Sequence, residues 1–389
     1  MDLDALLQHM IEIGGSDLHL KVDSPPLVRV DGSLTPVIGE GQLDDATLER
    51  FIEILTERTP NKRNFFHEYG DLDTAYVSPG NGRFRVNGFR QRGAISLAFR
   101  YIPKRVPSFE QLGLPAGVER LADEHRGLIL VTGATGSGKS TTLAAMIDKI
   151  NRTRKQHIVT IEDPIEIVHD DKGCIVNQRE VGLDTISYLE GIRRALRQDP
   201  DVILIGELRD EESARAALQA AESGHLVLST MHTIDAAETL GRMVEFFPPA
   251  KQEMTRQVLA GVLRGVISQR LLPRKDHGRI AAVEVMVNTA RIADLIRESR
   301  VDEISEAIED GSFHLMQSFS QHLVRLVLDD VVDFETASSA ATNRHDFEIE
   351  VDQALRRKQV EEGGEVASPF KAEEREDGDD EAIGLRVVG

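Results

Sequence analysis

The sequence of 389 residues has little cysteine and no long apolar run. Its single cysteine, Cys174, excludes an internal disulfide and a multi-cysteine zinc site, and its simplest role is that of a small buried apolar residue. No apolar run approaches the roughly 18 residues that span a bilayer, and the first residues, MDLDALLQHM, are acidic where a secretory signal would be basic. We therefore expect a soluble protein from a reducing, cytoplasmic compartment.

Positive charge is also scarce. Lys and Arg number 46 against 66 Asp and Glu, which gives a formal net charge of −20. Binding to duplex DNA depends on clustered Lys and Arg, so this balance argues against a general DNA-binding protein. Part of the acidity is local, because residues 359–389 are rich in Gly, Glu and Asp and have almost no apolar periodicity. We expect this acidic tail to be disordered.

Residues 1–105 mix helix and strand signals, which indicates an α+β domain. Residues 27–37 contain two extended segments around Asp31-Gly32 and predict an antiparallel hairpin with a two-residue turn. RFRVNGF and AISLAFRYI predict two further strands. Their period of two places Arg85 and Arg100 on the faces opposite the apolar side chains.

Residues 106–115 lie in a stretch with three prolines, which predicts an interdomain linker. From residue 116 to 358 apolar strands alternate with helical segments. GLILVTG, HIVTIEDP, VILIGE and HLVLSTMHT suit a parallel sheet that is buried on both faces. After Pro248 we expect mostly helix, including the whole of residues 249–272. The fold class is therefore predicted as α/β.

The first of these apolar strands leads into GATGSGKS, which has the G-x-x-x-x-G-K-S spacing of a phosphate-binding loop. Its glycines let consecutive backbone N–H groups turn around a phosphate at a helix N-terminus. The lysine then reaches the β and γ phosphates, and the serine hydroxyl can hold Mg²⁺. The predicted nucleotide-binding residues are Gly133, Ala134, Thr135, Gly136, Ser137, Gly138, Lys139, Ser140 and Thr141.

Two carboxylates follow strands that neighbour this loop. Glu162 ends IVTIE, and Glu207 ends VILIGE. Hydrolysis of a nucleoside triphosphate needs a carboxylate near the γ-phosphate to orient or deprotonate water, and the ends of these strands are where it should lie. An acidic residue after a strand is more often a helix cap or a solvated charge, but its position behind a phosphate-binding loop favours the catalytic interpretation.

Arginine and histidine side chains are further candidates. Arg193 and Arg197 share one face of a helix whose buried side is marked by Leu189, Ile192 and Leu196, and Arg209 follows the Glu207 strand. These arginines could stabilise charge during phosphoryl transfer, or they could form a solvated basic face that pairs with nearby aspartates. His225 and His232 bracket HLVLSTMH and fall at its opposite ends. Either a phosphate-sensing donor or two structural histidines would fit, and no third metal ligand is indicated.

A set of motifs along nearly the whole chain resembles the secretion ATPase superfamily, and within it the type IV pilus retraction ATPases of the PilT and PilU family. They are GGSDLHL, PPLVRVDG, RFRVNGFRQ, GATGSGKSTT, TIEDPIE, ALRQDPDVILIGELRD, GHLVLSTMHT, MQSFSQHL and ATNRHDFEIEV. The resemblance implies a PAS-like N-terminal domain over residues 1–105 and a RecA-like P-loop ATPase domain with a helical C-terminal part over residues 116–358.

It also implies a homohexameric ring that uses ATP and Mg²⁺ at the inner face of the cytoplasmic membrane. The implied partners are an inner-membrane pilus platform protein and a pilus assembly ATPase or retraction paralogue, with no specific nucleic acid.

The resemblance also implies roles for single residues. Glu162 matches the family's catalytic carboxylate, and Glu207 matches the glutamate that acts on Mg²⁺ together with Ser140. Arg85 and Arg100 match N-terminal arginines that approach the phosphates when the two domains close. The second arginine group and the histidine box correspond to Arg193, Arg197, Arg209, His225 and His232.

Two departures bear on the direction of movement. Assembly and type II secretion ATPases carry an extra N-terminal domain and a four-cysteine zinc motif, which this sequence lacks, and we therefore expect a retraction motor. The family's late motif AIRNLIRE reads ARIADLIRE at Ala290 to Glu298, which leaves an accessory role open. An assembly or secretion ATPase and a nucleotide-binding ring subunit of low turnover stay as alternatives, although the retained lysine, serine and two glutamates speak against the latter.

Overall fold

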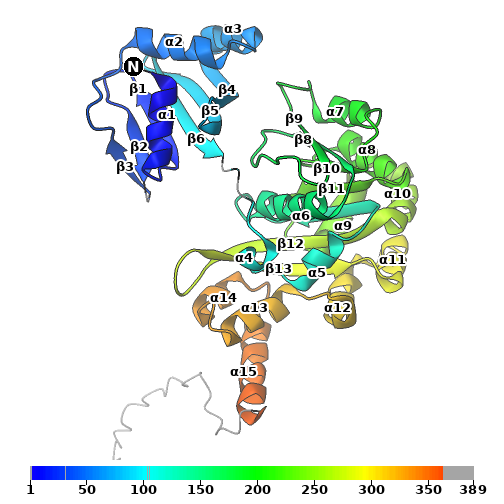
Figure 1. The fold of residues 1–389 in the computed structure, drawn as a ribbon. Coiled ribbons are helices and arrows are strands. Elements are labelled where there is room, and N and C mark those ends of the chain that lie inside the picture. The colour runs from blue at the N-terminus through cyan, green and yellow to red at the C-terminus, as the bar shows by residue number, and fades with distance from the viewer. Residues whose placement is uncertain (1, 31, 103, 105, 362–389) are drawn as a thin grey trace, which may run out of the picture.

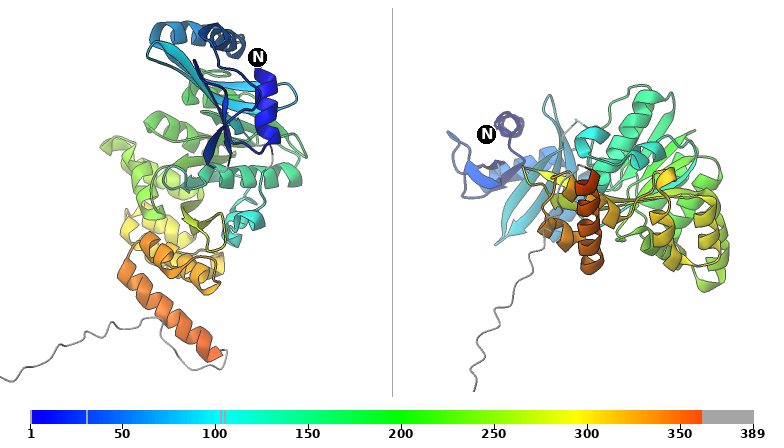
Figure 2. Two further views of the ribbon diagram at one scale, coloured as in Figure 1. Left: turned by 90° about the vertical axis from the view of Figure 1, so that its left-hand side faces the viewer. Right: turned by 90° about the horizontal axis from the view of Figure 1, so that it is seen from below.

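A computed structural model describes residues 2–30, 32–102, 104 and 106–361 of the chain. Figures 1 and 2 show two bodies, each built on its own sheet, with a group of helices at the far end of the second. The predicted acidic tail lies outside the described residues from position 362 onward. Residues 359–361 belong to the last helix. None of the helices in the described part of the chain has the length and apolar character that a bilayer crossing requires.

The N-terminal unit packs three helices and a six-stranded sheet around one apolar core. The strand order is β3-β2-β1-β6-β5-β4, and neighbouring strands pair antiparallel. The predicted hairpin is confirmed, since β2 and β3 pair from Leu27 with Pro36 to Val30 with Ser33. The elements are α1 (Leu3–Glu12), β1 (Asp17–Lys21), β2 (Leu27–Val30), β3 (Ser33–Pro36), α2 (Asp45–Leu55), α3 (Pro60–Tyr69), β4 (Asp71–Ser78), β5 (Gly82–Gln91) and β6 (Ala94–Ile102).

Strands β5 and β6 show why two arginines lie side by side on this unit. Phe84 and Val86 are fully buried, and the alternation of the strand therefore turns Arg85 outward. Arg85 is paired with Arg100 across the antiparallel ladder. Because directly opposite residues in such a ladder share a face, both guanidinium groups lie on the solvent side of the sheet, as the sequence pattern predicts.

The second unit is a seven-stranded sheet in the order β13-β12-β7-β11-β10-β8-β9. Neighbouring strands in it run parallel, except for β12 and β13, which are antiparallel. Leu128 and Leu130 of β7 enter one apolar cluster, while Ile129 and Val131 enter another on the opposite face. The sheet is therefore covered by helices on both faces, as expected from its continuous apolar strands.

The elements of this sheet unit are α4 (Phe109–Leu112), α5 (Ala116–Leu121), β7 (Gly127–Thr132), α6 (Lys139–Thr153), β8 (His157–Glu162), β9 (Ile175–Glu180), α7 (Tyr188–Ala195), β10 (Val202–Ile205), α8 (Glu211–Glu222), β11 (Leu226–Met231), α9 (Ala236–Glu245), α10 (Pro249–Val262), β12 (Leu263–Pro273), β13 (Arg279–Val287), α11 (Ala290–Arg297), η1 (Val301–Glu303), α12 (Ile304–Glu309), η2 (Ser312–His314), α13 (Phe319–Leu328), α14 (Phe334–Ala340) and α15 (Arg344–Glu361).

The expectation of an unbroken helix over residues 249–272 is wrong. Helix α10 ends at Val262, and the chain continues as β12, which pairs with β7 on one side and β13 on the other. Val266 and Ile267 are both buried, so successive residues of β12 enter the core from opposite faces. A short apolar run of this kind fits a buried strand and a buried helix equally well, and long-range pairing decides between them. Leu196, which is expected on the buried side of its helix, also differs from the prediction, because it is 36% exposed.

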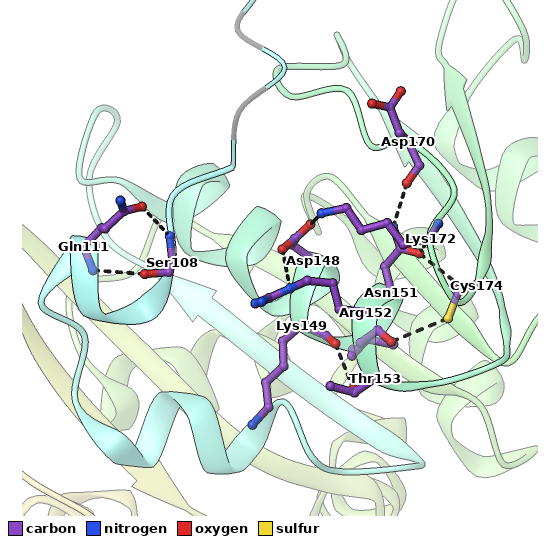
Figure 3. Close-up of polar contacts among 11 residues, drawn as sticks. Ser108, Gln111, Asp148, Lys149, Asn151, Arg152, Thr153, Asp170, Lys172 and Cys174 are labelled. Carbon is purple, nitrogen blue, oxygen red and sulfur yellow. Dashed lines mark hydrogen bonds and ion pairs between the residues drawn. The ribbon is translucent and has the colours of Figure 1, made fainter.

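Residues 106–115, predicted as a linker, contain the short helix α4. Ser108 and Gln111 form a reciprocal capping box at its start, which Figure 3 shows. Gly113 ends it in the left-handed region with φ 64°, where glycine is favoured. Phe109 is buried in the apolar cluster on the α6 face of the second sheet. This segment therefore leaves the N-terminal unit and then packs against the second one.

A buried polar chain crosses the second sheet from β7 to α9. The Thr132 hydroxyl donates to Ser268 Oγ at 3.0 Å, and Ser268 hydrogen-bonds Glu284 on the neighbouring strand. Glu284 Oε1 accepts the Ala236 backbone N–H at 2.8 Å, at the start of α9. Burial raises the pKa of Glu284 to about 7; Asp235 adds to this rise, and Arg270 opposes it. The strand that leads into the phosphate-binding loop is thus linked to α9 through a carboxyl group.

We expect this carboxyl group to make stability pH-dependent. Its pKa rises from the usual 4.5 to about 7 in the folded chain, so its contribution to stability is complete below pH 4.5 and is lost as the pH rises through 7. The loss amounts to about 3 kcal/mol. Urea unfolding of the wild type and of Glu284→Gln at pH 5 and pH 8 measures it: the amide variant should gain relative stability at pH 8. Glu253→Gln, at an exposed site on α10, is the control. An equal difference between wild type and Glu284→Gln at both pH values contradicts the expectation.

Candidate active site

The loop from Gly133 to Gly138 connects β7 to α6 at the carboxyl edge of the parallel sheet. Gly133 has φ 137°, and a Cβ atom there would lie 2.3 Å from the Gln269 carbonyl oxygen. Gly138 has φ 94° and forms the N-cap of α6 without a side-chain cap. The first N–H groups of a helix have no intrahelical partner, so this end of α6 presents donors and a positive dipole to an anion. The backbone conformation of the loop and the positive end of α6 therefore both suit the binding of a phosphate group.

Lys139 is buried at the mouth of this loop. Its Nζ donates to the carbonyl oxygens of Gly133 at 2.7 Å and Ala134 at 3.0 Å, and lies 3.5 Å from His232 Nδ1. Burial lowers the pKa of Lys139, while the charges of Glu207 and Glu166 oppose that change. The ammonium group is thus held by loop carbonyls and balanced by carboxylates.

One cleft of about 1030 Å³ contains most of the predicted site. It is lined by residues 135–138 of the loop and by residues 139–144 of α6. Side chains of both units contribute to it. The predicted catalytic residues in its lining are Arg85, Arg100, Glu162, Glu207, Arg209 and His232.

Glu162 lies at the last position of β8 and is held by two neighbours. Its Oε1 accepts the Thr160 hydroxyl at 2.6 Å and the Gln178 amide Nε2 at 3.1 Å. Burial raises the pKa of Glu162, these two hydrogen bonds oppose the rise, and the charge of Glu166 adds to it. A carboxylate whose pKa is raised is a better proton acceptor at neutral pH. Glu162 therefore has the properties of a general base.

Glu207 follows β10 and connects the lysine to an arginine. Its Oε1 lies 3.2 Å from His232 Nε2, and its Oε2 accepts Arg209 Nε at 2.8 Å and Nη2 at 2.7 Å. The hydrogen bond that Arg209 donates to Glu207 is the main cause of the raised pKa of Arg209. His232 bridges Glu207 and Lys139 through its two ring nitrogens. These contacts form a continuous polar chain along one wall of the cleft.

The two arginines of the N-terminal unit reach the same cleft from the other side. Arg100 Nε is 2.8 Å from Asp17 Oδ1, and its side chain is 73% exposed. Arg85 is exposed and has no ion-pair partner among the residues that the structure describes. Both guanidinium groups could form charge-assisted hydrogen bonds with an anion in the cleft.

Three of the predicted site residues do not line this cleft. Arg193 pairs with Glu190 at 3.2 Å on the exposed face of α7, and Arg197 is exposed. His225 precedes β11, and its Nδ1 lies 2.9 Å from Ser223 Oγ. Because the phosphate loop lies at the carboxyl ends of the strands, His225 is at the opposite edge of the sheet from His232. The catalytic roles of Arg193, Arg197 and His225 stay predictions.

The sequence pattern missed Gln178, which lies on β9. Besides holding Glu162, its Nε2 donates to the Ile167 carbonyl oxygen at 2.9 Å, and its Oε1 accepts the His169 N–H at 2.7 Å. Its strand is polar, with the sequence IVNQRE, and gives no apolar pattern that predicts a strand. The pairing of Thr160 with Gln178 across β8 and β9 creates the contact.

The segment between β8 and β9 is also fixed at its far end, to α6. Asn151 is fully buried, donates its side-chain amide to the Asp170 carbonyl oxygen at 2.8 Å, and accepts the Lys172 N–H at 3.1 Å. Lys172 contacts Asp148 on the same helix at 2.5 Å, as Figure 3 shows. The segment that carries the acidic motif is therefore bound at one end to the helix that begins in the phosphate loop.

The phosphate loop on a parallel sheet, with carboxylates after neighbouring strands, defines a P-loop ATPase. The chain belongs to the family described as type II/IV secretion system protein, which it matches over residues 2–362. It is 44% identical over 348 residues to the type IV pilus retraction ATPase PilT of Pseudomonas aeruginosa, covering 89% of this chain and 100% of PilT. It is 39% identical to the type IV pilus ATPase PilU of the same organism, covering 90% of this chain and 91% of PilU.

A crystal structure of the pilus retraction motor PilT with bound ADP has the same fold. The TM-score is 0.83 at 42% identity, over 89% of this chain and 98% of that one. These similarities confirm the predicted family, the predicted α/β fold class and the prediction of an ATP-hydrolysing enzyme. The roles of single residues and the domain boundaries stay predictions.

We expect two substitutions in this cleft to separate binding from turnover. Glu207→Gln keeps the size of the side chain but removes the charge that organises His232 and Arg209, so nucleotide binding should persist while kcat falls on the order of 100-fold. Lys139→Ala removes the charge at the phosphate loop and should weaken binding itself. Equilibrium binding of a fluorescent ATP analogue and steady-state phosphate release measure both effects.

The matched controls are Glu222→Gln on α8 and Lys155→Ala after α6, both at exposed positions. They should behave as the wild type. Normal turnover of Glu207→Gln would remove this carboxylate from the mechanism.

Proposed function

We propose that this chain is the ATP-driven motor of type IV pilus retraction, which extracts pilin from the base of the fibre. The observation that carries the proposal is the cleft in which a phosphate loop and two carboxylates face arginines of a second unit. Similarity to PilT along the whole length of that protein supports it. ATP is the substrate, and water attacks its γ-phosphate without a covalent enzyme intermediate.

Binding of the triphosphate is the task of the loop and of Lys139. The N–H groups at the start of α6 and the loop backbone bind the phosphate oxygens, and the buried ammonium group adds charge next to them. The carbonyl oxygens that hold Lys139 are those of the loop itself, at 2.7 and 3.0 Å, so the side chain is already directed at the phosphate position.

Mg²⁺ is the cation that the cleft would hold, through Ser140 and Glu207. Hydroxyl and carboxylate oxygens are ligands that Mg²⁺ prefers, and both side chains line the cleft. Glu207 retains acceptor capacity beside its contacts with Arg209 and His232, because a carboxylate offers about four lone-pair positions. When bound, the ion neutralises charge on the phosphate oxygens.

Glu162 orients the attacking water and accepts its proton. The hydrogen bonds from Thr160 and Gln178 fix the carboxylate at the end of β8, and its raised pKa favours proton acceptance. Arg209 and His232 hold Glu207 in place after the neighbouring strand β10. Arg193 and Arg197, of the second arginine group, do not line the cleft of their own chain.

Arg85 and Arg100 couple the nucleotide to movement. They belong to a PAS-like domain, residues 1–105, which is joined through residues 106–115 to the ATPase domain of residues 116–358. They stabilise charge on the phosphates when the two domains close, so that nucleotide state sets the domain angle. Six copies form a ring at the inner face of the cytoplasmic membrane, where they move a platform protein of the pilus.

An accessory role in retraction is the second candidate. The altered first half of the late motif at Ala290 to Glu298, in α11, favours it. Such a subunit would join a retraction paralogue and hydrolyse ATP with the same residues. An assembly motor would use the same chemistry in the opposite direction.

Deletion of the gene in its own host separates these functions. A retraction motor predicts long, unretracted pili and the loss of twitching motility. Complementation with the Lys139→Ala gene should fail, while the Lys155→Ala gene should restore retraction. A strain without pili would contradict retraction and indicate an assembly motor. A strain that still retracts with reduced force would indicate the accessory role.

A further inference from the structure

A buried ion pair joins the two units beside the cleft. Arg83 Nη2 on β5 lies 2.5 Å from Glu180 Oε2 at the end of β9. The Arg83 side chain is 14% exposed and that of Glu180 is 3% exposed. The other ion pairs that involve described residues of the N-terminal unit, such as Arg100 with Asp17, lie within that unit.

Glu180 has a second function in its own unit. The carboxylate oxygen that receives Arg83 also accepts the Ile165 backbone N–H at 3.2 Å, three residues after Glu162. Glu180 is also the direct strand partner of Glu162, because β8 and β9 pair in register at these positions. Glu180 therefore touches both the N-terminal unit and the segment that begins at the proposed general base.

Gln178 lies two residues earlier on β9 and so faces the same side of the strand. It holds Glu162 Oε1, the Ile167 carbonyl oxygen and the His169 N–H. Together, Gln178 and Glu180 bind residues 162–169 at four points from one face of β9. A shift of β9 would therefore move the Glu162 carboxylate.

The contact between Arg83 and Glu180 joins two opposite charges with little solvent around them, but it is made through a single guanidinium nitrogen. An ion pair with little solvent around it costs free energy when one partner is removed, because the other charge is left buried and unpaired. Yet only one guanidinium nitrogen contacts Glu180, and Arg83 Nε is buried without a partner. Lys62 of α3 approaches the same turn: a Cβ atom at Gly182 would lie 3.8 Å from its Nζ. A movement of the N-terminal unit would therefore change this contact.

We propose that Glu180 is a positioning residue for Glu162, and that Arg83, by docking on Glu180, makes the order of residues 162–169 depend on the position of the N-terminal unit. The inference rests on the hydrolytic role proposed for Glu162. It assigns to Arg83 a task different from that of Arg85, which lines the nucleotide cleft itself. Domain position then controls the general base as well as the arginines that face the phosphates.

Steady-state kinetics of the full chain test the pair. Arg83→Ala and Glu180→Gln should each lower kcat about 10- to 100-fold, since a small misplacement of a catalytic group costs up to that much, while KM and the Kd of a fluorescent ATP analogue change less than about 2-fold. The double variant should lose no more than the worse single variant, because the two residues act through one contact. Arg83→Lys, which keeps the charge, should recover most of the loss.

Arg215→Ala is the matched control, since it breaks an exposed ion pair with Glu211 on α8. It should leave kcat unchanged. Circular dichroism and analogue binding check that each variant is folded, and Arg83→Lys still tests the contact if Glu180→Gln does not fold. Wild-type kcat in Arg83→Ala, multiplicative losses in the double variant, or no recovery in Arg83→Lys would each overturn the inference.

Glu162→Gln, measured in parallel, separates this inference from the proposed function. If Glu162→Gln keeps wild-type turnover, the hydrolytic role of Glu162 fails. If it is inactive while the Arg83 and Glu180 variants are normal, the proposed function stands and only the positioning role fails.

Discussion

The structure depends on a buried positive charge at the carboxyl edge of a parallel sheet. Lys139 is held there by two carbonyl oxygens of its own loop and lies 3.5 Å from His232, which contacts Glu207. Removing an ammonium group from water is costly unless polar partners surround it. The strands β7, β10 and β11 supply those partners because their carboxyl ends meet at one edge. A phosphate anion completes the same arrangement.

Both units contribute side chains to the cleft around this charge. The second unit holds the phosphate loop, Glu162 and Glu207, while the first contributes Arg85 and Arg100 to the same cleft. Neither set alone surrounds an anion. The ion pair of Arg83 with Glu180 lies at the boundary between them and adjoins the strand pair that carries Glu162. The N-terminal unit and the segment that begins at the proposed general base are therefore in contact within a single chain.

The parts of the site that follow local patterns could be predicted from the sequence. The loop at Gly133 to Ser140 and the glutamates after apolar strands have fixed spacings, and the outward position of Arg85 follows from strand alternation. The pairing of β12 with β7 and the polar edge strand β9 could not be predicted, because they depend on partners far along the chain. Gln178 and Glu180 were missed for that reason. His225 and His232 bracket one strand, and only its direction in the sheet places His232 at the edge that carries the phosphate loop.

We propose that Arg85 and Arg100 act on the nucleotide of their own subunit. The most direct test is ATP turnover by rings reassembled from a mixture of Arg85→Ala and Glu162→Gln subunits, each nearly inactive alone. If Arg85 acts within its own chain, every site in a mixed ring lacks one essential group and activity stays low. Marked recovery on mixing would mean that the arginine reaches a neighbouring subunit, and would contradict the account.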